Sequence, residues 1–334
     1  MDHDRRCLRL CAGVLVSAIL FRLAAVGAFR PVGVWLRQPA TASFLLYLET
    51  GRVVRACPEP TAPPSAPTEA PEPPTEPPTA PEPAALTFSE EEAEDLPIYY
   101  RCSYRPPISQ LLTQPLDWKL GENGPKVLIV HTHTCESYTP EEPGAYESSG
   151  NYRTLDRDYS VVRIGALVAQ RLEEAGIGVI HDREYHDYPS YNQAYPNTAA
   201  STARLLQEYP TLELVIDLHR DAADTPAGQL VTACSIEGQT AAQLMMVVGT
   251  GECGLELPQW QENLSAALKL QALLERENPG ICRRLILTDQ RYNQHLGKNA
   301  LLIEVGAAGN TLHEAELAAQ QLAEALIALA DGSG

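Results

Sequence analysis

Two histidines and a carboxylate follow directly after an apolar run in this chain. The run 127–130 is followed by His131, His133 and Glu136 within the sequence HTHTCESY. A short, β-branched apolar run predicts a buried strand. Polar residues at its carboxyl end predict side chains at the edge of a sheet, where α/β enzymes carry out their chemistry. We therefore interpret this segment as the first part of a candidate active site.

Two further apolar runs carry polar groups in a similar way. The run 212–218 is followed by His219 and Arg220, and the run 300–306 is apolar except for Glu304. A single residue of this kind is usually a packed side chain with a satisfied partner. Two histidine-bearing strand ends and a carboxylate inside a third strand would each need a separate buried partner. The combination therefore favours a functional site.

Imidazoles and carboxylates are ligands that zinc accepts, and a catalytic zinc site uses three of them and leaves a fourth position for water. His133, His219 and one acid would provide the three ligands. Zinc lowers the pKa of its water to about 7, and a further carboxylate then transfers the proton to the leaving group. Glu304 suits that transfer, so the residues predict a zinc-dependent hydrolase.

Three ordered motifs, HTHTCESY, DLHRDA and LLIEVGAAGNTLHEA, resemble those of the stage II sporulation protein P family. The resemblance extends from about Val127 to the end of the chain. That family resembles the zinc-dependent N-acetylmuramoyl-L-alanine amidases of cell-wall turnover. The resemblance therefore implies cleavage of the amide that joins lactyl-muramate to the stem peptide of peptidoglycan, and cleavage of peptide cross-links is also attributed to the family.

The same resemblance implies roles for individual residues and for partners. One histidine of HTHTCESY and His219 would bind Zn²⁺, and Glu304 would be the general base and acid. The family works at a dividing or engulfing septum, together with a glycan-cleaving partner and a membrane protein. An engulfment role is therefore implied for this chain.

The third zinc ligand is open among three residues. Glu136 is our first choice because it leaves the strand end beside the histidines. Asp158 lies where related amidases place an acid, and His131 could replace either. If His131 lies in the strand and His133 beyond its end, alternation favours His133 for the metal. His131 would then support a ligand or stabilise the transition state.

Cys135 provides the alternative mechanism. A thiolate of Cys135 activated by His131 would make the protein a cysteine-dependent peptidase. Against this, no third orienting residue is evident, and Glu304 and His219 would have no role. Cys135 is therefore interpreted as a packed side chain. The chain has 8 cysteines without a CxxC pair or zinc-finger spacing, which argues against a structural zinc site or a redox motif.

Segments 138–158 and 183–198 are rich in Tyr, Asn, Ser, Gly and Pro, and we expect them to be loops around the site. Aromatic side chains in such loops could stack on sugar or peptide. Tyr138, Arg220 and Asn310 are the candidates for substrate binding.

The amino terminus predicts a membrane anchor within residues 1–30. A mostly apolar stretch runs from Leu10 to Phe29 with Arg22 inside it, which is about the length that crosses a bilayer. Arginines before this stretch predict that the short head stays in the cytoplasm and the remainder is exported. No clear cleavage site follows, so an uncleaved single-pass anchor is preferred to a signal peptide.

The composition then changes before the main domain. Residues 31–56 are expected to be an extracytoplasmic connecting segment, and residues 57–95, rich in Pro and Glu, a disordered spacer that holds the domain away from the membrane. The acidic run 89–95 is interpreted as solvated surface without chemistry. The formal net charge of −18 argues against a nucleic-acid partner.

Residues 96–334 are predicted to form the catalytic domain, a single, mainly parallel, twisted sheet of the α/β class flanked by helices and amidase-like by resemblance. Strands are predicted at 126–131, 177–181, 212–218, 229–236, 245–249, 284–288 and 299–305. A helix over 161–172 is expected to end at Gly176, and a later helix begins with a capping box of Thr311 and Glu314.

The sequence thus predicts a membrane-anchored zinc amidase that acts on peptidoglycan outside the cytoplasm. The alternatives are the Cys135-dependent peptidase and a non-catalytic scaffold that retains the fold and binds the cell wall.

Overall fold

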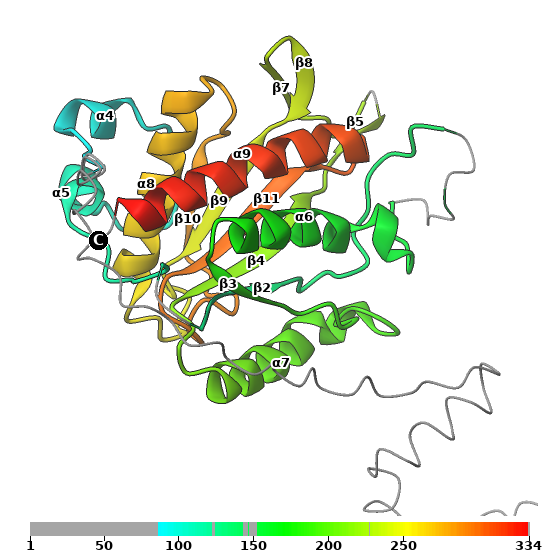
Figure 1. Ribbon diagram of the computed structural model, residues 1–334, viewed down its shortest axis with the longest axis horizontal. Coiled ribbons are helices and arrows are strands. Elements are labelled where there is room, and N and C mark those ends of the chain that lie inside the picture. The colour runs from blue at the N-terminus through cyan, green and yellow to red at the C-terminus, as the bar shows by residue number, and fades with distance from the viewer. Residues whose placement is uncertain (1–85, 122–123, 143–145, 147–151, 227, 333–334) are drawn as a thin grey trace, which may run out of the picture. The chain divides into compact units, whose positions relative to one another are not determined.

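A computed structural model describes residues 86–121, 124–142, 146, 152–226 and 228–332 of the chain (Figure 1). The predicted anchor (1–30), the connecting segment (31–56) and most of the predicted spacer lie outside these residues. Within the described part of the chain, no helix combines the length and apolar character needed to cross a bilayer.

One seven-stranded sheet forms the centre of the described domain, in the order β1-β10-β9-β11-β4-β2-β3. The strands are β1 (Ile98–Arg101), β2 (Pro125–Val130), β3 (Gly178–His181), β4 (Leu214–Asp221), β9 (Leu244–Gly249), β10 (Leu285–Thr288) and β11 (Ala300–Ala307). Every neighbouring pair is parallel except β11 and β9, which are antiparallel. The predicted α/β class with a mainly parallel sheet is confirmed.

Helices cover both faces of this sheet, but unequally (Figure 1). The larger core lies on one face, under α6 (Val161–Glu174), α8 (Trp260–Glu277) and α9 (Leu312–Asp331). On the other face α7 (Ala194–Glu208) packs through Leu205 on Leu128, Val130 and Val215 of β2 and β4. The third cluster lies on β9 and β11 and contains no helix residue of the described chain.

Strand alternation decides which side chains reach the site. In β4, Ile216 and Leu218 belong to the larger core, whereas Val215 packs on the α7 side. Successive side chains of a strand point to opposite faces, so Asp217 and His219 share the face of Val215. In β11 the same alternation places Glu304 on that face, because Ile303 belongs to the larger core.

The predicted helix boundaries are confirmed for α6 and α9. Ser160 caps α6 through a hydrogen bond from Val162 N, and Gly176 follows its end with φ +84°, the left-handed conformation that glycine adopts without steric cost. Thr311 and Glu314 form the predicted capping box of α9. Each cap satisfies backbone N–H groups that the first turn of a helix leaves without partners.

Two predictions about local structure were wrong. Residues 229–236 are not one strand, because β6 (Gly228–Gln229) pairs with β5 (Asp224–Thr225), and β7 (Ala233–Ile236) pairs with β8 (Gln239–Ala242). The composition of the segment does not reveal this change of partner.

The predicted loop 183–198 also contains η2 (Tyr191–Gln193) and the start of α7. Pro196 lies in the first turn of α7, where its missing N–H is not needed.

The ordered domain begins before residue 96, so the predicted end of the spacer needs correction. Helix α4 (Glu90–Asp95) occupies the acidic run and starts with a capping box of Ser89 and Glu92. Arg276 of α8 forms an ion pair with Glu92. Helix α5 (Ile108–Thr113) follows β1. The acidic run is therefore a capped helix tied to α8, a role that its charge alone does not indicate.

Candidate active site

His133, Glu136 and His219 lie together in the folded domain. All three are buried, and one ligand atom from each can be chosen so that these atoms lie within 4.8 Å of one another. These are the residues that the sequence proposed for zinc. Asp158, the alternative acid, is exposed in a short 3-10 helix and does not join this group.

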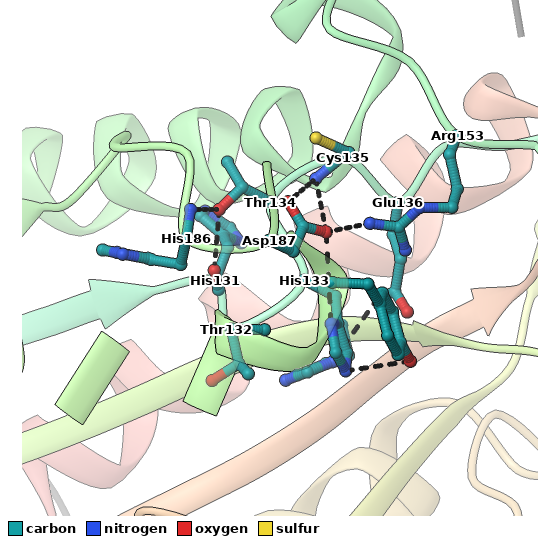
Figure 2. A network of polar contacts seen from close by, with 12 residues as sticks. His131, Thr132, His133, Thr134, Cys135, Glu136, Arg153, His186 and Asp187 are labelled. Carbon is teal, nitrogen blue, oxygen red and sulfur yellow. Dashed lines mark hydrogen bonds and ion pairs between the residues drawn. The ribbon is translucent and has the colours of Figure 1, made fainter. Parts of the chain in front are cut away.

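The segment after β2 is fixed by its own polar groups (Figure 2). Thr132 donates from its backbone N and its hydroxyl to the two carboxylate oxygens of Asp217, at 2.8 and 2.6 Å. Thr134 Oγ1 donates to the His131 carbonyl at 2.9 Å, and Glu136 N donates to the His133 carbonyl at 2.9 Å. The turn is therefore tied to β4 and held in one shape.

Glu136 is ionised in this environment. Its Oε2 lies 3.4 Å from His219 Nδ1, its Oε1 lies 3.6 Å from Arg220 Nη1, and Arg220 N donates to Oε2 at 3.3 Å. Burial raises the pKa of Glu136, but the Arg220 guanidinium and His219 outweigh burial and lower it to about 2. A carboxylate held in this charged form suits a metal ligand.

His219 stands between two carboxylates. Its Nδ1 faces Glu136, and its Nε2 lies 2.9 Å from Asp217 Oδ1 without hydrogen-bond geometry. Burial lowers the pKa of His219, but Asp217 and Glu136 raise it well above its ordinary value. One ring nitrogen thus faces another candidate ligand while the second faces a carboxylate, the arrangement that commonly orients histidine ligands of metals.

A buried ring nitrogen without a hydrogen bond also indicates that this group of residues fits a metal ion. His133 Nδ1 is buried and makes no hydrogen bond to any described residue, and it lies 4.0 Å from Asp187 Oδ2. An unpaired buried polar atom costs stability, and coordination of a cation would remove that cost. The residues present therefore fit the Zn²⁺ that the sequence implied.

Glu304 lies beside this group. It pairs in register with His219 on the neighbouring strand, and its Oε2 is buried without a hydrogen-bond partner among the described residues. Burial raises the pKa of Glu304 to about 8. A carboxyl group with a pKa near neutrality can both accept and return a proton, so this environment is compatible with the role predicted for Glu304.

Residues that sequence reasoning missed complete the surroundings. Asp187 accepts from Cys135 N at 3.2 Å and forms an ion pair with Arg153 (Figure 2). Asp217 could have been found from sequence, because it precedes His219 by two residues and a strand places such residues on one face. Asp187 and Arg153 lie in loops, whose positions no sequence period reveals.

Tyrosines line one side of the site. Tyr191 stacks on the His133 ring with centroids 4.5 Å apart and 3° between the planes, and Arg153 lies over the Tyr191 ring. Tyr191 is 55% exposed. Tyr195 contacts the His133 ring edge-on with centroids 5.7 Å apart, and Tyr292 lies near Tyr195. An exposed aromatic surface of this kind can stack on a sugar or peptide group.

His131 does not belong to the site, so its predicted catalytic role and its alternative role as a ligand need correction. It is fully buried, its Nδ1 lies 2.9 Å from the Leu218 carbonyl, and its Nε2 lies 2.8 Å from His181 Nε2. Burial lowers the pKa of His131 to about 4. Both nitrogens are occupied, so His131 is a packed, neutral histidine.

Cys135 is unsuited to nucleophilic attack. Its side chain is buried, and burial together with the nearby Asp187 carboxylate raises the pKa of the thiol to about 12. A thiolate is the reactive form, and this environment opposes it. The interpretation of Cys135 as a packed side chain agrees with this geometry.

The predicted substrate-binding residues are structural. Tyr138 is buried, and its hydroxyl donates to the Val305 carbonyl at 3.0 Å. Asn310 is fully buried and bonds to Thr232 and Glu314. Arg220 is buried, and besides Glu136 it donates to the carbonyl groups of residues 137 and 152. Tyr138 and Asn310 therefore do not face substrate, and Arg220 positions Glu136 instead.

Comparison with known proteins places this site in a family context. The model of a family described as stage II sporulation protein P (SpoIIP) matches residues 69–327. The stage II sporulation protein P of Bacillus subtilis (strain 168) is 28% identical over 209 residues, which are 59% of this chain and 49% of that protein. The chain thus spans about half the length of the curated relative it matches.

Solved structures of N-acetylmuramoyl-L-alanine amidases are similar in part. AmiC2 of Nostoc punctiforme has a TM-score of 0.36 and 10% identity, with coverage of 61% of this chain and 97% of that one. The amidase from Clostridium difficile 630 has a TM-score of 0.38 and 13% identity, with coverage of 64% and 100%. The CwlD amidase from Clostridioides difficile, solved in complex with the GerS lipoprotein, has a TM-score of 0.37 and 16% identity, with coverage of 62% and 95%.

Proposed function

Because the chain belongs to the stage II sporulation protein P family, we propose that it is a metal-dependent hydrolase that cleaves the N-acetylmuramoyl-L-alanine amide of peptidoglycan. The observation that carries the proposal is the buried group of His133, Glu136 and His219 beside Glu304, whose pKa is raised to about 8. A candidate ligand set and a proton carrier thus lie together, with His219 and Glu304 on adjacent strands and His133 and Glu136 in the turn after β2.

His133, Glu136 and His219 would hold Zn²⁺. When bound, zinc polarises a carbonyl and lowers the pKa of coordinated water to about 7. Asp217 keeps His219 oriented through the contact at Nε2. Arg220 keeps Glu136 ionised and, through its bonds to two backbone carbonyls, holds the turn that carries Glu136.

Glu304 performs the proton transfers. It accepts the proton of the attacking water and passes it to the amide nitrogen, so that the peptide leaves as a neutral amine. Its raised pKa makes return of the proton favourable near neutral pH. Burial on the strand next to His219 keeps the carboxyl group close to the reacting atoms.

Two observations favour this hydrolase over the alternatives. A wall-binding scaffold would gain nothing from keeping buried polar atoms without hydrogen bonds, which lower stability, yet Glu304 Oε2 and His133 Nδ1 are in that state. A Cys135-dependent peptidase would need an accessible thiol of low pKa, and Cys135 is buried with its pKa raised to about 12. Cleavage of peptide cross-links is a second activity that the family resemblance implies.

The proposal extends to the setting of the enzyme. The apolar stretch from Leu10 to Phe29 would anchor the chain in the membrane, and the Pro-rich residues after it would carry the catalytic domain into the wall outside the cytoplasm. The family resemblance supports a role in engulfment during sporulation, with a glycan-cleaving partner and a membrane protein. The overall negative charge gives no reason to expect a nucleic-acid partner.

Purified peptidoglycan sacculi test the activity directly. The full-length chain is incubated with sacculi after zinc loading, after chelation, and after zinc is restored, and released fragments are identified by mass spectrometry. We expect intact stem peptides and glycan with free lactyl groups, in the zinc-loaded and restored samples only. Products that contain only split cross-links would show that the protein is an endopeptidase and not an amidase. Absence of any zinc-dependent product would contradict the proposal that the protein is an enzyme. Glu304→Gln serves as the inactive control.

A further inference from the structure

One half of the sheet face that carries Glu304 has no helix over it among the described residues. Helix α7 covers the β2 and β4 half of that face. On the other half, Met245, Val247 and Leu302 form a small cluster against which Ile286 and Tyr292 pack. Met245 pairs in register with Glu304 across the antiparallel strands β9 and β11. A buried apolar cluster therefore lies one strand away from the candidate catalytic carboxylate, with the half-buried Ile286 at its edge.

A depression adjoins the edge of this cluster. It has a volume of about 500 Å³ and is lined by Pro97, Tyr99, Met245, Arg284 and Ile286, among others. Ligand pockets commonly have volumes of about 300–1,000 Å³. Tyr99 is 52% exposed, and it pairs in register with Ile286 on the neighbouring strand. The depression thus lies on the sheet, between the edge strand β1 and the strand next to Glu304.

The charge of the depression is opposite to that of the chain. Arg284 is exposed, lines the depression, and has no hydrogen bond or ion pair with another residue in the part of the chain that the structure describes. Its neighbour Arg283 is already paired with Asp221 at 2.6 Å. In a chain with a formal net charge of −18, an unpaired guanidinium beside an apolar hollow favours a ligand that carries a carboxylate on an apolar or peptide frame.

We infer that this depression binds the stem-peptide arm of peptidoglycan, with Arg284 pairing a free carboxylate of the peptide and Tyr99 packing against its backbone. The inference rests on the proposed function, because it names where the leaving side of that substrate lies. Arg284 would be a specificity-determining residue that prefers free over amidated stem-peptide carboxylates.

The spacing agrees with this assignment. Neighbouring strands lie about 4.8 Å apart, so a group over β10 lies about 10 Å from one on β11. An extended peptide advances by about 3.3 Å per residue. A carboxylate two to three residues from the cleaved amide would therefore reach the depression while the amide lies at Glu304. Only β9, which carries Met245, lies between β10 and β11 in the sheet.

Two soluble muropeptides test the inference, one with free stem-peptide carboxylates and one with the same carboxylates amidated. For the full-length chain we expect kcat/KM about tenfold higher for the free form, through KM, because a charge-assisted bond made equally in ground and transition states changes KM alone. Arg284→Ala should remove this preference and Arg284→Lys should restore part of it. Arg171→Ala, at an exposed arginine of α6, should keep it.

Labelling by a stem peptide that carries a photoreactive group provides a readout that does not need turnover. We expect the crosslinks, mapped by mass spectrometry, at Tyr99, Met245 or Ile286. Hydrolysis without carboxylate preference, or labelling only outside the depression, would overturn the inference and leave the proposed function intact. Labelling in the depression by a chain that hydrolyses nothing would support the inference as a binding site and contradict the proposed function.

Discussion

Two pairs of histidines lie at the carboxyl ends of neighbouring strands, and they differ in how their nitrogens are satisfied. In the first pair, Arg183 Nε donates to His181 Nδ1 at 3.1 Å, the two Nε2 atoms lie 2.8 Å apart, and His131 Nδ1 lies 2.9 Å from the Leu218 carbonyl. This chain of contacts is complete when both rings are neutral. Burial accordingly lowers the pKa of His131 to about 4 and that of His181 to about 2.

The second pair, His133 and His219, has ring centroids 5.3 Å apart but no such chain of contacts. His133 Nδ1 lacks a hydrogen bond to any described residue, and Glu136 and Asp217 both approach His219. Histidine spacing alone therefore does not identify a metal site. Carboxylate neighbours and unsatisfied ring nitrogens distinguish the pair that would bind metal from the pair that only packs.

Replacement of one histidine from each pair gives the largest contrast. His219→Ala should reduce bound zinc and turnover to background, because two ligands hold the metal less tightly and Glu136 loses a partner. His131→Gln should keep zinc near one equivalent, since His131 lies outside the ligand group. Metal analysis of both purified variants measures this. Loss of zinc in His131→Gln with the fold intact would remove the distinction between the pairs.

A change at Glu304 separates proton transfer from metal binding. Glu304→Gln should retain zinc and lower kcat by about 10² to 10⁴, because the amide cannot accept and return a proton. Glu136→Gln is the matched control, and we expect it to lose zinc as well as activity. Metal content is measured beside kinetics for both variants. A zinc-free Glu304→Gln protein would make Glu304 a ligand and the assignment of Glu136 wrong.

A smaller effect is expected from the carboxylate that orients His219. Asp217→Asn keeps the shape and one of the two acceptors for Thr132, and its amide can donate to the Thr132 hydroxyl in place of the other, but it removes the negative charge beside His219 Nε2. Such supporting groups typically change metal affinity by 10- to 100-fold. Competition with a chelator measures the affinity. Unchanged zinc affinity in this variant would show that Asp217 is needed only for the turn at Thr132.

The first pair should make stability depend on pH. His181 has its pKa lowered to about 2 by burial and by the adjacent His131, whereas an unfolded histidine has a pKa of about 6.5. Below about pH 6.5 the unfolded chain therefore binds a proton at His181 that the folded chain does not bind. The His181 contribution to the free energy of unfolding is complete above about pH 6.5 and is lost as the pH falls toward 2. The loss is at most about 1.4 kcal/mol per pH unit.

Chemical unfolding between pH 7 and pH 4 tests this dependence. His181→Gln should flatten the decline in unfolding free energy, whereas His313→Gln, at an exposed histidine, should leave it unchanged. Equal slopes for wild type and His181→Gln would mean that the first pair does not resist protonation.

Sequence patterns identified those parts of the site that depend on strand ends. His219 and Glu304 follow from apolar runs, and register then places them side by side. His131 was misassigned because β2 ends at Val130 and the partner His181 comes from another strand end, which local spacing does not reveal. Tyr138 and Asn310 look like loop residues in the sequence, yet tertiary packing buries them. Asp187 and Arg153 come from loops whose paths only the fold determines.

The sequence also predicted every strand of the seven-stranded sheet except the edge strand β1. Long apolar runs identified β2, β4 and β11, whereas the edge strand β1 (Ile98–Arg101) was missed because it is short and half of its residues are exposed. The change from one expected strand at 229–236 to two hairpins has the same origin, since pairing of exposed residues leaves no hydrophobic period. Among the described residues, the half of the sheet face at β9, β10 and β1 has no helix over it because α7 packs on β2 and β4, and no local sequence pattern predicts this.

The smallest effect is expected at Cys135, which lies in the same turn as His133 but does not share its role. Cys135→Ala should lower kcat/KM by less than about twofold, because the thiol is buried and its pKa is raised to about 12 by burial and by Asp187. The backbone N of residue 135 still donates to Asp187 in the variant, so the loop that carries Arg153 keeps its anchor. Kinetics on soluble muropeptide, before and after treatment of wild type with a thiol-alkylating reagent, measure the contribution of the thiol. A large loss of turnover in Cys135→Ala with zinc still bound would contradict the metal-dependent mechanism. It would instead support the Cys135-dependent peptidase, in which the thiol attacks the substrate.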